Sequence, residues 1–523
     1  MCSCLMSPGL FGSPPAARTR PTALRCETAG GEAALAGGMR TLGAAVGRSQ
    51  APARLLLEGA TVVDTRDGSL SPATDIFLRD GRIAGLAPSG GAPHAADLTR
   101  IDARGRYVTP GFLDMHAHTL QMADPSGSLQ LMLAHGVTGF RQLAGSSALL
   151  EQRRDGALPL PADSPEVLEI AGAVLTPANA ATPAMAVATV RGQKDEGADF
   201  IKAALVTPEV FFAAQAEAHR LGLPILGHLP TGIDAAEASR GGMKSIEHLG
   251  PGVGILASCS SDEAALRAAM AGRPQLKGPP FRIPFADQLM APVIRRLVLN
   301  PMTVTQKADV EILAHAIDTF DEGKCLALAD RFVADGTWQC PTLIRVRTQE
   351  LADDPDLQSD PDLAYVAAST LKAWKAVTET FSKLPAESRA TFRKAYDLQL
   401  KLTGLFDRAG VRMIAGSDVS GAAWQVPGIT LHDEFDELAR AGLTPLRVLQ
   451  MTTLHAAEFL GRTAEMGTVA VGKLADLVLL DANPMQSVGN LHAVGGVVRA
   501  GTYYSRADLE ALKRGVASAK SVH

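Results

Sequence analysis

Eight short apolar runs, each separated from the next by a helical stretch or a longer insertion, constrain the fold of this chain most strongly. They lie between Pro110 and Gly461 and read GFLDMHAH, GVTGFRQL, EVLEIAGA, DFIKAAL, LPILGH, MKSIEH, WQCPTLIR and VRMIAGSD. Strands that alternate with helices form parallel sheets. Eight such units predict a closed (β/α)8 barrel, the TIM barrel, whose active site lies at the carboxyl ends of the strands.

Shorter strand-like runs with glycine turns flank this section on both sides. They occupy 52–109 and 466–505, and include LLLEGATVVD and MGTVAVGKLADLVLLD. Such spacing is typical of small antiparallel strands. We therefore expect an α/β protein with one composite β-sandwich built from both ends of the chain, into which the barrel of 110–465 is inserted.

The remaining segments are assigned by composition and spacing. Residues 1–51 are rich in Ala, Gly, Pro and Arg and predict a disordered tail, and Met39 offers a second possible start. Insertions of about 250–335 and 345–408 are expected on the active-site face, as a lid, an oligomer contact or simple decoration of the barrel. Residues 506–523 are expected to form a terminal helix or tail.

Composition excludes several classes of protein. Among the 523 residues, 46% are hydrophobic and 20% are charged, and the formal net charge of -5 is too acidic for a nucleic-acid binder. No apolar run reaches the roughly 18 residues that a membrane helix needs. The six cysteines are widely scattered, so no disulfide framework is predicted. These features favour a cytoplasmic protein, expected to be a homo-oligomer, that acts on a small molecule without membrane or nucleic-acid partners.

Ionisable side chains stand at the ends of the predicted barrel strands. His116 and His118 are two residues apart, so a strand directs both to one face. Imidazole and carboxylate ligands together suit zinc and similar divalent ions. The candidate metal ligands are His116, His118, Lys202, His228, His248 and Asp418.

Lys202 fits this set only if its charge is removed. A neutral lysine amine reacts with carbon dioxide to give a carbamate, which is an anionic bridge with two oxygens. A pair of cations would favour that product because the ions reverse the local preference for a protonated amine. The set therefore predicts two divalent ions, with Zn²⁺ as the expected metal and carbon dioxide or bicarbonate as the source of the carboxyl group.

Several phrases of the chain resemble the amidohydrolase superfamily, in particular its binuclear branch of imidazolonepropionase-like amidohydrolases, Xaa-Pro dipeptidases and ochratoxinase. The phrases extend from about residue 54 to 500, and their order and spacing together make the resemblance specific. They are TPGFLDMHAH, GVTGFRQLAG, GADFIK, ILGHLP, KSIEHLG, VRMIAGSD, LARAGLTPLRVLQMTTLHAAEFLG and MGTVAVGKLADLVLLDANP.

The resemblance implies a role for each ligand. His116, His118 and Asp418 would hold the more buried ion, His228 and His248 the more exposed one, and carboxylated Lys202 would bridge them. A hydroxide bridging the two ions would be the nucleophile, and Asp418 would take its proton and pass it to the leaving amine. The chain departs from its relatives at Gln142, where many carry Asp, and it lacks a substrate-gripping Tyr after His228.

The expected function is hydrolysis of an amide bond in an N-acyl amino acid, a dipeptide or an aryl amide resembling ochratoxin. Arg141 and Arg345 lie near strand ends and are candidates to hold a substrate carboxylate. Three alternatives remain: an esterase, lactonase or organophosphate hydrolase on the same binuclear site, a mononuclear deaminase-type hydrolase with unmodified Lys202, and a catalytically silent scaffold.

Overall fold

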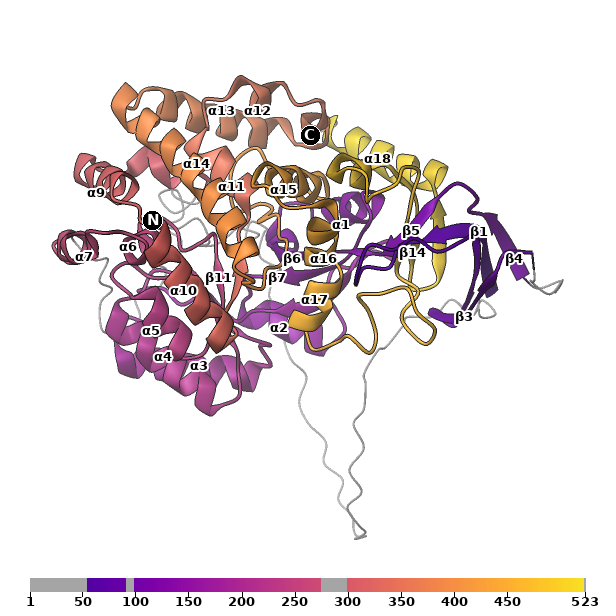
Figure 1. Ribbon diagram of the computed structural model, residues 1–523, viewed down its shortest axis with the longest axis horizontal. Coiled ribbons are helices and arrows are strands. Elements are labelled where there is room, and N and C mark those ends of the chain that lie inside the picture. Colours follow the sequence, from indigo (N-terminus) through magenta and orange to yellow (C-terminus); the bar gives the residue numbers. More distant parts are fainter. Residues whose placement is uncertain (1–53, 91–97, 274–298, 522–523) are drawn as a thin grey trace, which may run out of the picture.

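The structure is a computed structural model that describes residues 54–90, 98–273 and 299–521. The predicted tail of 1–51 and the alternative start at Met39 lie outside these ranges. Strands from both ends of the chain form one eight-stranded sheet at the right of Figure 1. Its strands are β1 (Arg54–Val62), β2 (Thr74–Arg79), β3 (Arg82–Pro88), β4 (Leu98–Asp102), β5 (Tyr107–Pro110), β13 (Leu477–Leu480), β14 (Val494–Arg499) and β15 (Thr502–Ser505).

The two ends meet where β5 pairs antiparallel with β13, with Val108 opposite Leu479. The order is β15-β14-β13-β5-β1-β2-β3, and β4 pairs with β1 beside this path. The apolar side chains of these strands pack together in a core of their own that includes Leu57, Ile76 and Val498. Burial of these side chains stabilises a sheet whose strands are distant in sequence.

Seven parallel strands follow within the middle of the chain, one in each of the first seven apolar runs. They are β6 (Phe112–Ala117), β7 (Val137–Gln142), β8 (Glu166–Ile170), β9 (Ile201–Ala203), β10 (Ile225–Gly227), β11 (Met243–Glu247) and β12 (Trp338–Cys340). They form a three-stranded sheet, β6-β7-β8, and a four-stranded sheet, β12-β11-β10-β9. The side chains of most of these strands are buried throughout, as expected of strands covered on both faces.

Isolated parallel bridges connect the two sheets. Ala171 pairs with Phe200 between β8 and β9, and Gln339 of β12 pairs with Met413. Val419 pairs with Ala117 of β6. Within the run VRMIAGSD, Ile414 donates to the carbonyl of Gln339 on one side and Asp418 to that of His116 on the other, but the run does not form the regular eighth strand that its sequence predicts. The arrangement is consistent with the expected barrel.

The helices between these strands often begin at a polar residue followed by proline. Asp124 and Thr182 accept hydrogen bonds from the backbone N–H groups of Gly127 and Met185, and proline at the first helical position has no N–H to leave unpaired. These helices are α1 (Pro125–Ala134), α2 (Ser147–Arg154), α3 (Pro183–Glu196), α4 (Pro208–Arg220), α5 (Ala235–Arg240), α15 (Ile429–Arg440), α16 (Pro445–Met451) and α17 (Leu454–Phe459).

Two groups of helices follow β11 and β12 (Figure 1). The first has α6 (Gly254–Ser258), α7 (Glu263–Ala271), η2 (Pro301–Val304), α9 (Lys307–Asp318) and α10 (Glu322–Asp335). The second has α11 (Leu343–Glu350), α12 (Pro355–Ser359), η3 (Pro361–Tyr365), α13 (Ala368–Ser382) and α14 (Ala386–Arg408). The terminal helix α18 (Arg506–Ser521) packs Leu509 against Leu133 and Ala134 of α1, and so joins the end of the chain to the middle.

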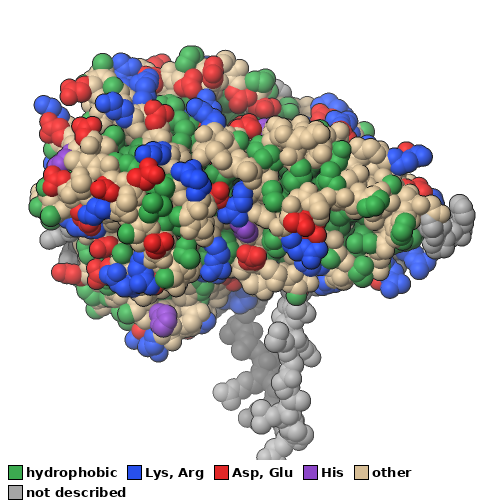
Figure 2. All heavy atoms as spheres, viewed as in Figure 1, with side chains coloured by type: hydrophobic (Ala, Val, Ile, Leu, Met, Phe, Trp, Pro, Cys, Tyr) green, Lys and Arg blue, Asp and Glu red, His purple; other side chains and the backbone are tan. Residues whose placement is uncertain are grey.

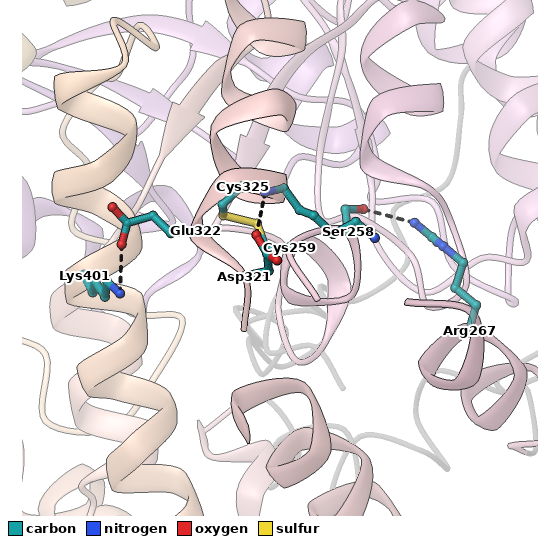
Figure 3. Close-up of a disulfide and its surroundings, with 8 residues drawn as sticks. Ser258, Cys259, Arg267, Asp321, Glu322, Cys325 and Lys401 are labelled. Carbon is teal, nitrogen blue, oxygen red and sulfur yellow. Dashed lines mark hydrogen bonds and ion pairs between the residues drawn. A yellow bond between two sulfur atoms is a disulfide. The ribbon is translucent and has the colours of Figure 1, made fainter. Parts of the chain in front are cut away.

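A disulfide contradicts the expectation from cysteine spacing. Cys259, at the end of α6, is bonded to Cys325 of α10, and their Cα atoms lie 4.4 Å apart (Figure 3). The scattered cysteines did not reveal the pair because α6 and α10 meet only in the folded chain, where the N–H of Asp321 donates to the carbonyl of Cys259. Cys340 is a buried free cysteine on β12.

Acidic and basic side chains are interspersed on the face of the molecule shown in Figure 2. None of the described helices is both long and apolar enough to cross a membrane.

Candidate metal centre

The six candidate ligands come together at the carboxyl ends of the parallel strands. His116 lies on β6 and Lys202 on β9, whereas His118, His228 and His248 directly follow β6, β10 and β11. Asp418 precedes the bridge at Val419. All six side chains are buried, with at most 4% of each residue exposed.

Asp418 is the hub of this cluster. Its Oδ1 lies 2.9 Å from Nε2 of His118 and 3.1 Å from Nε2 of His116. Its Oδ2 lies 3.7 Å from Nε2 of His248 and 2.5 Å from Nε of Arg345. The two carboxylate oxygens therefore face two different groups of side chains.

Lys202 and His228 complete the cluster. Nζ of Lys202 lies 3.0 Å from Nε2 of His116, and neither side chain is exposed to solvent. The ring centroid of His228 lies 4.8 Å from that of His248, which in turn lies 4.8 Å from that of His116. The histidine rings thus form a continuous group around Asp418.

Unusual backbone conformations position three of these side chains. His248 and Asp418 have φ angles of 57° and 56°, in the left-handed region that non-glycine residues seldom adopt and that is enriched at functional sites. Gly227 has φ of 123°, and a Cβ there would lie 2.3 Å from the carbonyl oxygen of Ala203. Only glycine allows β10 to approach β9 this closely, and the N–H of His228 then donates to that carbonyl at 2.9 Å.

Two contacts orient the histidine rings from behind. Nδ1 of His116 donates to Oε2 of Glu247 at 2.7 Å, and Ser245 donates to the other oxygen of Glu247 at 2.6 Å. Nδ1 of His248 lies 2.5 Å from Oγ1 of Thr342, whose own hydrogen goes to the carbonyl of Pro341. In both rings Nδ1 is occupied, so Nε2 is directed at the centre, as is usual for metal-binding histidines.

The sequence did not reveal Glu247 as a functional residue. Strand alternation places Glu247 and His248 on opposite faces, but the left-handed conformation at His248 ends the alternation and brings both side chains to the cluster. The sequence did contain one indication of Glu247: Ser245 and Glu247 are two residues apart on a strand, so both lie on one face, directly before the candidate ligand His248.

The charges of the cluster shift several pKa values. Burial and the Lys202 ammonium lower the pKa of His116, but the Asp418 and Glu247 carboxylates outweigh them and raise it to about 10. Burial and the Arg345 guanidinium lower the pKa of His228 to about 3 and hold that of His248 well below its usual value. His228 and His248 are therefore neutral, which is the form that ligates metal, whereas at His116 a cation would compete with a proton.

The donor set fits a divalent metal. Ligand atoms of His116, His118 and Asp418 lie within 4.8 Å of one another, and so do those of His116, Glu247 and Cys340. Two imidazoles and a carboxylate are the ligands of many catalytic zinc sites, which leave a position open for water. The first group, directed at the strand ends, has the composition of a catalytic site.

The two candidate substrate arginines lie in different surroundings. Arg345, in the first turn of α11, reaches Asp418 and is part of the cluster. Arg141 of β7 pairs instead with Glu169 at 2.8 Å and lies over the rings of Phe200 and Phe459, with its guanidinium carbon 4.7 and 4.5 Å from their centroids. The structure thus brings Arg345, but not Arg141, into contact with Asp418.

Comparisons with known proteins find similarity to amidohydrolases. The amidohydrolase family profile matches residues 399–516. An imidazolonepropionase from Maricaulis maris is 27% identical over 449 residues, which cover 82% of this chain and 92% of that protein. An adenine deaminase from Rubrobacter xylanophilus is 31% identical over 156 residues, which are 26% of this chain and only 25% of the deaminase.

Solved structures share the fold over most of their length. A bottromycin amidohydrolase superposes with a TM-score of 0.65 at 24% identity, covering 90% of this chain and 91% of its own. A Xaa-Pro dipeptidase with bound methionine gives 0.58 at 17% identity, covering 86% of this chain and 100% of its own. The chain is similar to amidohydrolases over most of its length, which confirms the resemblance read from the sequence.

Proposed function

We propose that the chain is a metal-dependent hydrolase that cleaves an amide bond in a small substrate such as an N-acyl amino acid, a dipeptide or an aryl amide. The observation that carries this proposal is the convergence of four histidines, Lys202 and Asp418 in one buried cluster at the strand ends. A metal-polarised carbonyl attacked by an activated water is the chemistry that such a set supports.

We also propose that the chain forms the closed barrel and the β-sandwich that the sequence predicts. The bridges at Ala171, Gln339 and Val419 would close the parallel strands into a (β/α)8 barrel. The eight-stranded sheet would fold at β1 into a β-sandwich, because β1 pairs with β4 along its first half, with β2 as far as Ala60, and with β5 at its end. The apolar core of this sheet would fill the space between the two layers.

Two ions, with Zn²⁺ as the expected metal, would be held by the six side chains. His116, His118 and Asp418 would hold the first ion, His228 and His248 the second, and Lys202 would join them after carboxylation. Bound metal would act as a Lewis acid and make a water molecule more acidic. Lys202 is fully buried and its Nζ lies 3.0 Å from Nε2 of His116, so the carboxylated side chain would stand beside a ligand of the first ion.

The protein's own groups would orient and move protons. Asp418 reaches both His116 and His118 through Oδ1 and would accept the proton of the attacking water and deliver it to the leaving amine. Glu247 would keep His116 in one tautomer. The closed, buried position of the cluster excludes bulk water and so strengthens each of these electrostatic contacts.

A deaminase with a single ion is the second candidate. It is favoured by the compactness of the group formed by His116, His118 and Asp418, in which all ligand atoms lie within 4.8 Å. In that enzyme Lys202 would remain unmodified. Metal content separates the two candidates, since the binuclear enzyme requires about two ions per chain and the deaminase one.

The test begins with metal analysis of purified protein loaded with zinc and bicarbonate. Lys202→Ala should lose both metal loading and turnover, and Asp418→Asn should lower kcat by about 100-fold or more, as expected for the loss of a general base. Turnover should be screened on N-acyl amino acids, dipeptides, aryl amides, esters, lactones and organophosphates. Full activity of Lys202→Ala with one ion would refute the binuclear site, and activity on lactones alone would refute amide hydrolysis.

The cellular compartment and the oligomeric state of the protein are also proposed. The cytoplasm and a homo-oligomer are the expectations from sequence. The disulfide between Cys259 and Cys325 weighs against the cytoplasm because such bonds persist mainly in oxidising compartments.

A further inference from the structure

Arg345 lies on the side of Asp418 where the second ion is expected. Its Nε is 2.5 Å from Oδ2, the same oxygen that faces Nε2 of His248 at 3.7 Å. The other oxygen, Oδ1, faces Nε2 of His118 at 2.9 Å and Nε2 of His116 at 3.1 Å. One half of the centre is thus arranged for a metal ion, while a permanent cation lies in the other half.

The position of Arg345 is set by the backbone. It lies in the first turn of α11, and this helix begins three residues after β12 ends. The N–H of the preceding residue, Ile344, donates to the buried carboxylate of Glu434 at 2.8 Å, and the N–H of Arg345 donates to the carbonyl of Thr342 at 3.0 Å. Only 2% of Arg345 is exposed, so its charge is poorly screened by water.

A guanidinium cannot lose its proton at any ordinary pH and so repels every cation brought beside it. A second ion at His228 and His248 would have to share Oδ2 of Asp418 with this group. By contrast, the first ion would use Oδ1, the oxygen beside His116 and His118. An anion that paired with the guanidinium would remove the competitor, and carboxylates match its planar fork of donors.

Resting on the function proposed above, we propose that Arg345 is a cationic competitor for the second metal position, so that the two ions bind in order. The first ion enters at His116, His118 and Asp418. The second binds strongly at His228 and His248 only when Arg345 has left Oδ2 for the carboxylate of an anionic substrate. Binding of the second ion and of a substrate carboxylate are then coupled, and the coupling must act equally in both directions.

The test measures zinc binding to the metal-free full-length chain, with saturating bicarbonate, by competition with a chromophoric chelator. Wild-type protein should bind one ion tightly and a second more weakly. Arg345→Met should tighten only the second step, by about 5- to 150-fold, the usual range for coupled sites. Arg345→Lys keeps a positive charge and should tighten it less.

Arg347→Met is the matched control. Arg347 lies two residues further along α11 and pairs with Asp354 and Glu437, so its loss should leave both steps unchanged. An unaltered first step in Arg345→Met shows that this variant has folded. In the wild type, which needs no variant, acetate should tighten the second step, and it should have no such effect in Arg345→Met.

Equal second-step affinities in wild type and Arg345→Met, or an equal effect of acetate on both, would refute the role of Arg345 while leaving the binuclear hydrolase intact. Absence of any tight zinc step in the wild type would instead refute the proposed function itself.

Discussion

Glu247 accepts the Nδ1 proton of His116 at 2.7 Å, and this one contact directs Nε2 of the same ring at Asp418 and Lys202. Both side chains are fully buried. Burial opposes the charge of Glu247, but His116 outweighs it and lowers the pKa of the carboxyl to about 2, so Glu247 is an anion behind the ring. A negative charge at that position makes the opposite nitrogen a stronger ligand.

Glu247→Gln should therefore weaken zinc binding at the first site by about 10- to 100-fold, the usual cost of losing such a contact. The measurement is a zinc titration with a competing chelator. Glu169→Gln is the matched control, since Glu169 pairs with Arg141 rather than with a ligand. Equal losses in the two variants would mean that Glu247 acts on stability and not on the ligand.

Gly227→Ala tests the packing of β10 against β9. The added methyl group would lie 2.3 Å from the carbonyl oxygen of Ala203 and 3.1 Å from Cγ of Lys202, at a φ of 123° that alanine resists. The strands must separate, which should displace Lys202 and reduce metal content as well as melting temperature. Gly222→Ala also replaces a glycine of positive φ but has nothing within 4 Å of the added carbon, so it should lower the melting temperature alone.

Glu350 should make stability depend on pH. Burial raises the pKa of this carboxyl from 4.5 to about 8, although Arg345 partly opposes the shift. Below about pH 4.5 the group is protonated in both folded and unfolded chains and contributes no pH dependence. Between about 4.5 and 8 the unfolded chain binds fewer protons than the folded one, so stability falls as pH rises, by at most about 1.4 kcal/mol per pH unit.

Glu350→Gln should remove this decline. Its melting temperature should change less between pH 5 and 8 than that of the wild type, as measured by scanning calorimetry. Glu387→Gln, at an exposed position of α14, serves as the control and should behave like the wild type. Parallel curves for all three proteins would exclude Glu350 as the source.

The disulfide should stabilise the contact between α6 and α10. It joins cysteines separated by 66 positions, and closing a loop of that size is expected to contribute about 2–4 kcal/mol. Replacing both cysteines by alanine should lower the melting temperature. A reductant should lower the melting temperature of the wild type but not that of the double variant.

Lys401→Met is the comparison for this pair, because it removes the neighbouring ion pair with Glu322, whose N···O distance is 3.0 Å (Figure 3). Both partners are about half exposed, so this loss should be small. A wild type whose melting temperature is unaffected by reductant would show that the bridge contributes nothing to stability.

The sequence predicted the strands that depend on local patterns. Each of the first seven apolar runs contains one strand, because continuous apolar segments bounded by turns have few other ways to bury their side chains. The eighth run does not form a regular strand, because it is joined to its neighbours by isolated bridges at Met413 and, just beyond the run, at Val419 rather than by a continuous ladder. The candidate ligands could be located for the same local reason, since each lies where a predicted strand ends, and their role as metal ligands stays a prediction.

Features that depend on contacts with residues distant in the sequence could not be predicted from the sequence. Glu247 and Thr342 became recognisable only when their contacts with His116 and His248 were known. Arg141 and Arg345 are equivalent in the sequence, each near a strand end, and only the fold distinguishes the one enclosed by Phe200 from the one that reaches Asp418. Side-chain direction at the end of a strand depends on backbone angles that the residue pattern does not specify.

The pairing of β5 with β13 has a consequence for synthesis. A ribosome delivers β5 before any strand of the two parallel sheets, yet the partner of Val108 is Leu479, which emerges only after those strands have been translated. The early strands must therefore wait with an open edge, which is a risk for aggregation during translation. Truncation near the C-terminus should accordingly damage strands at the opposite end of the chain.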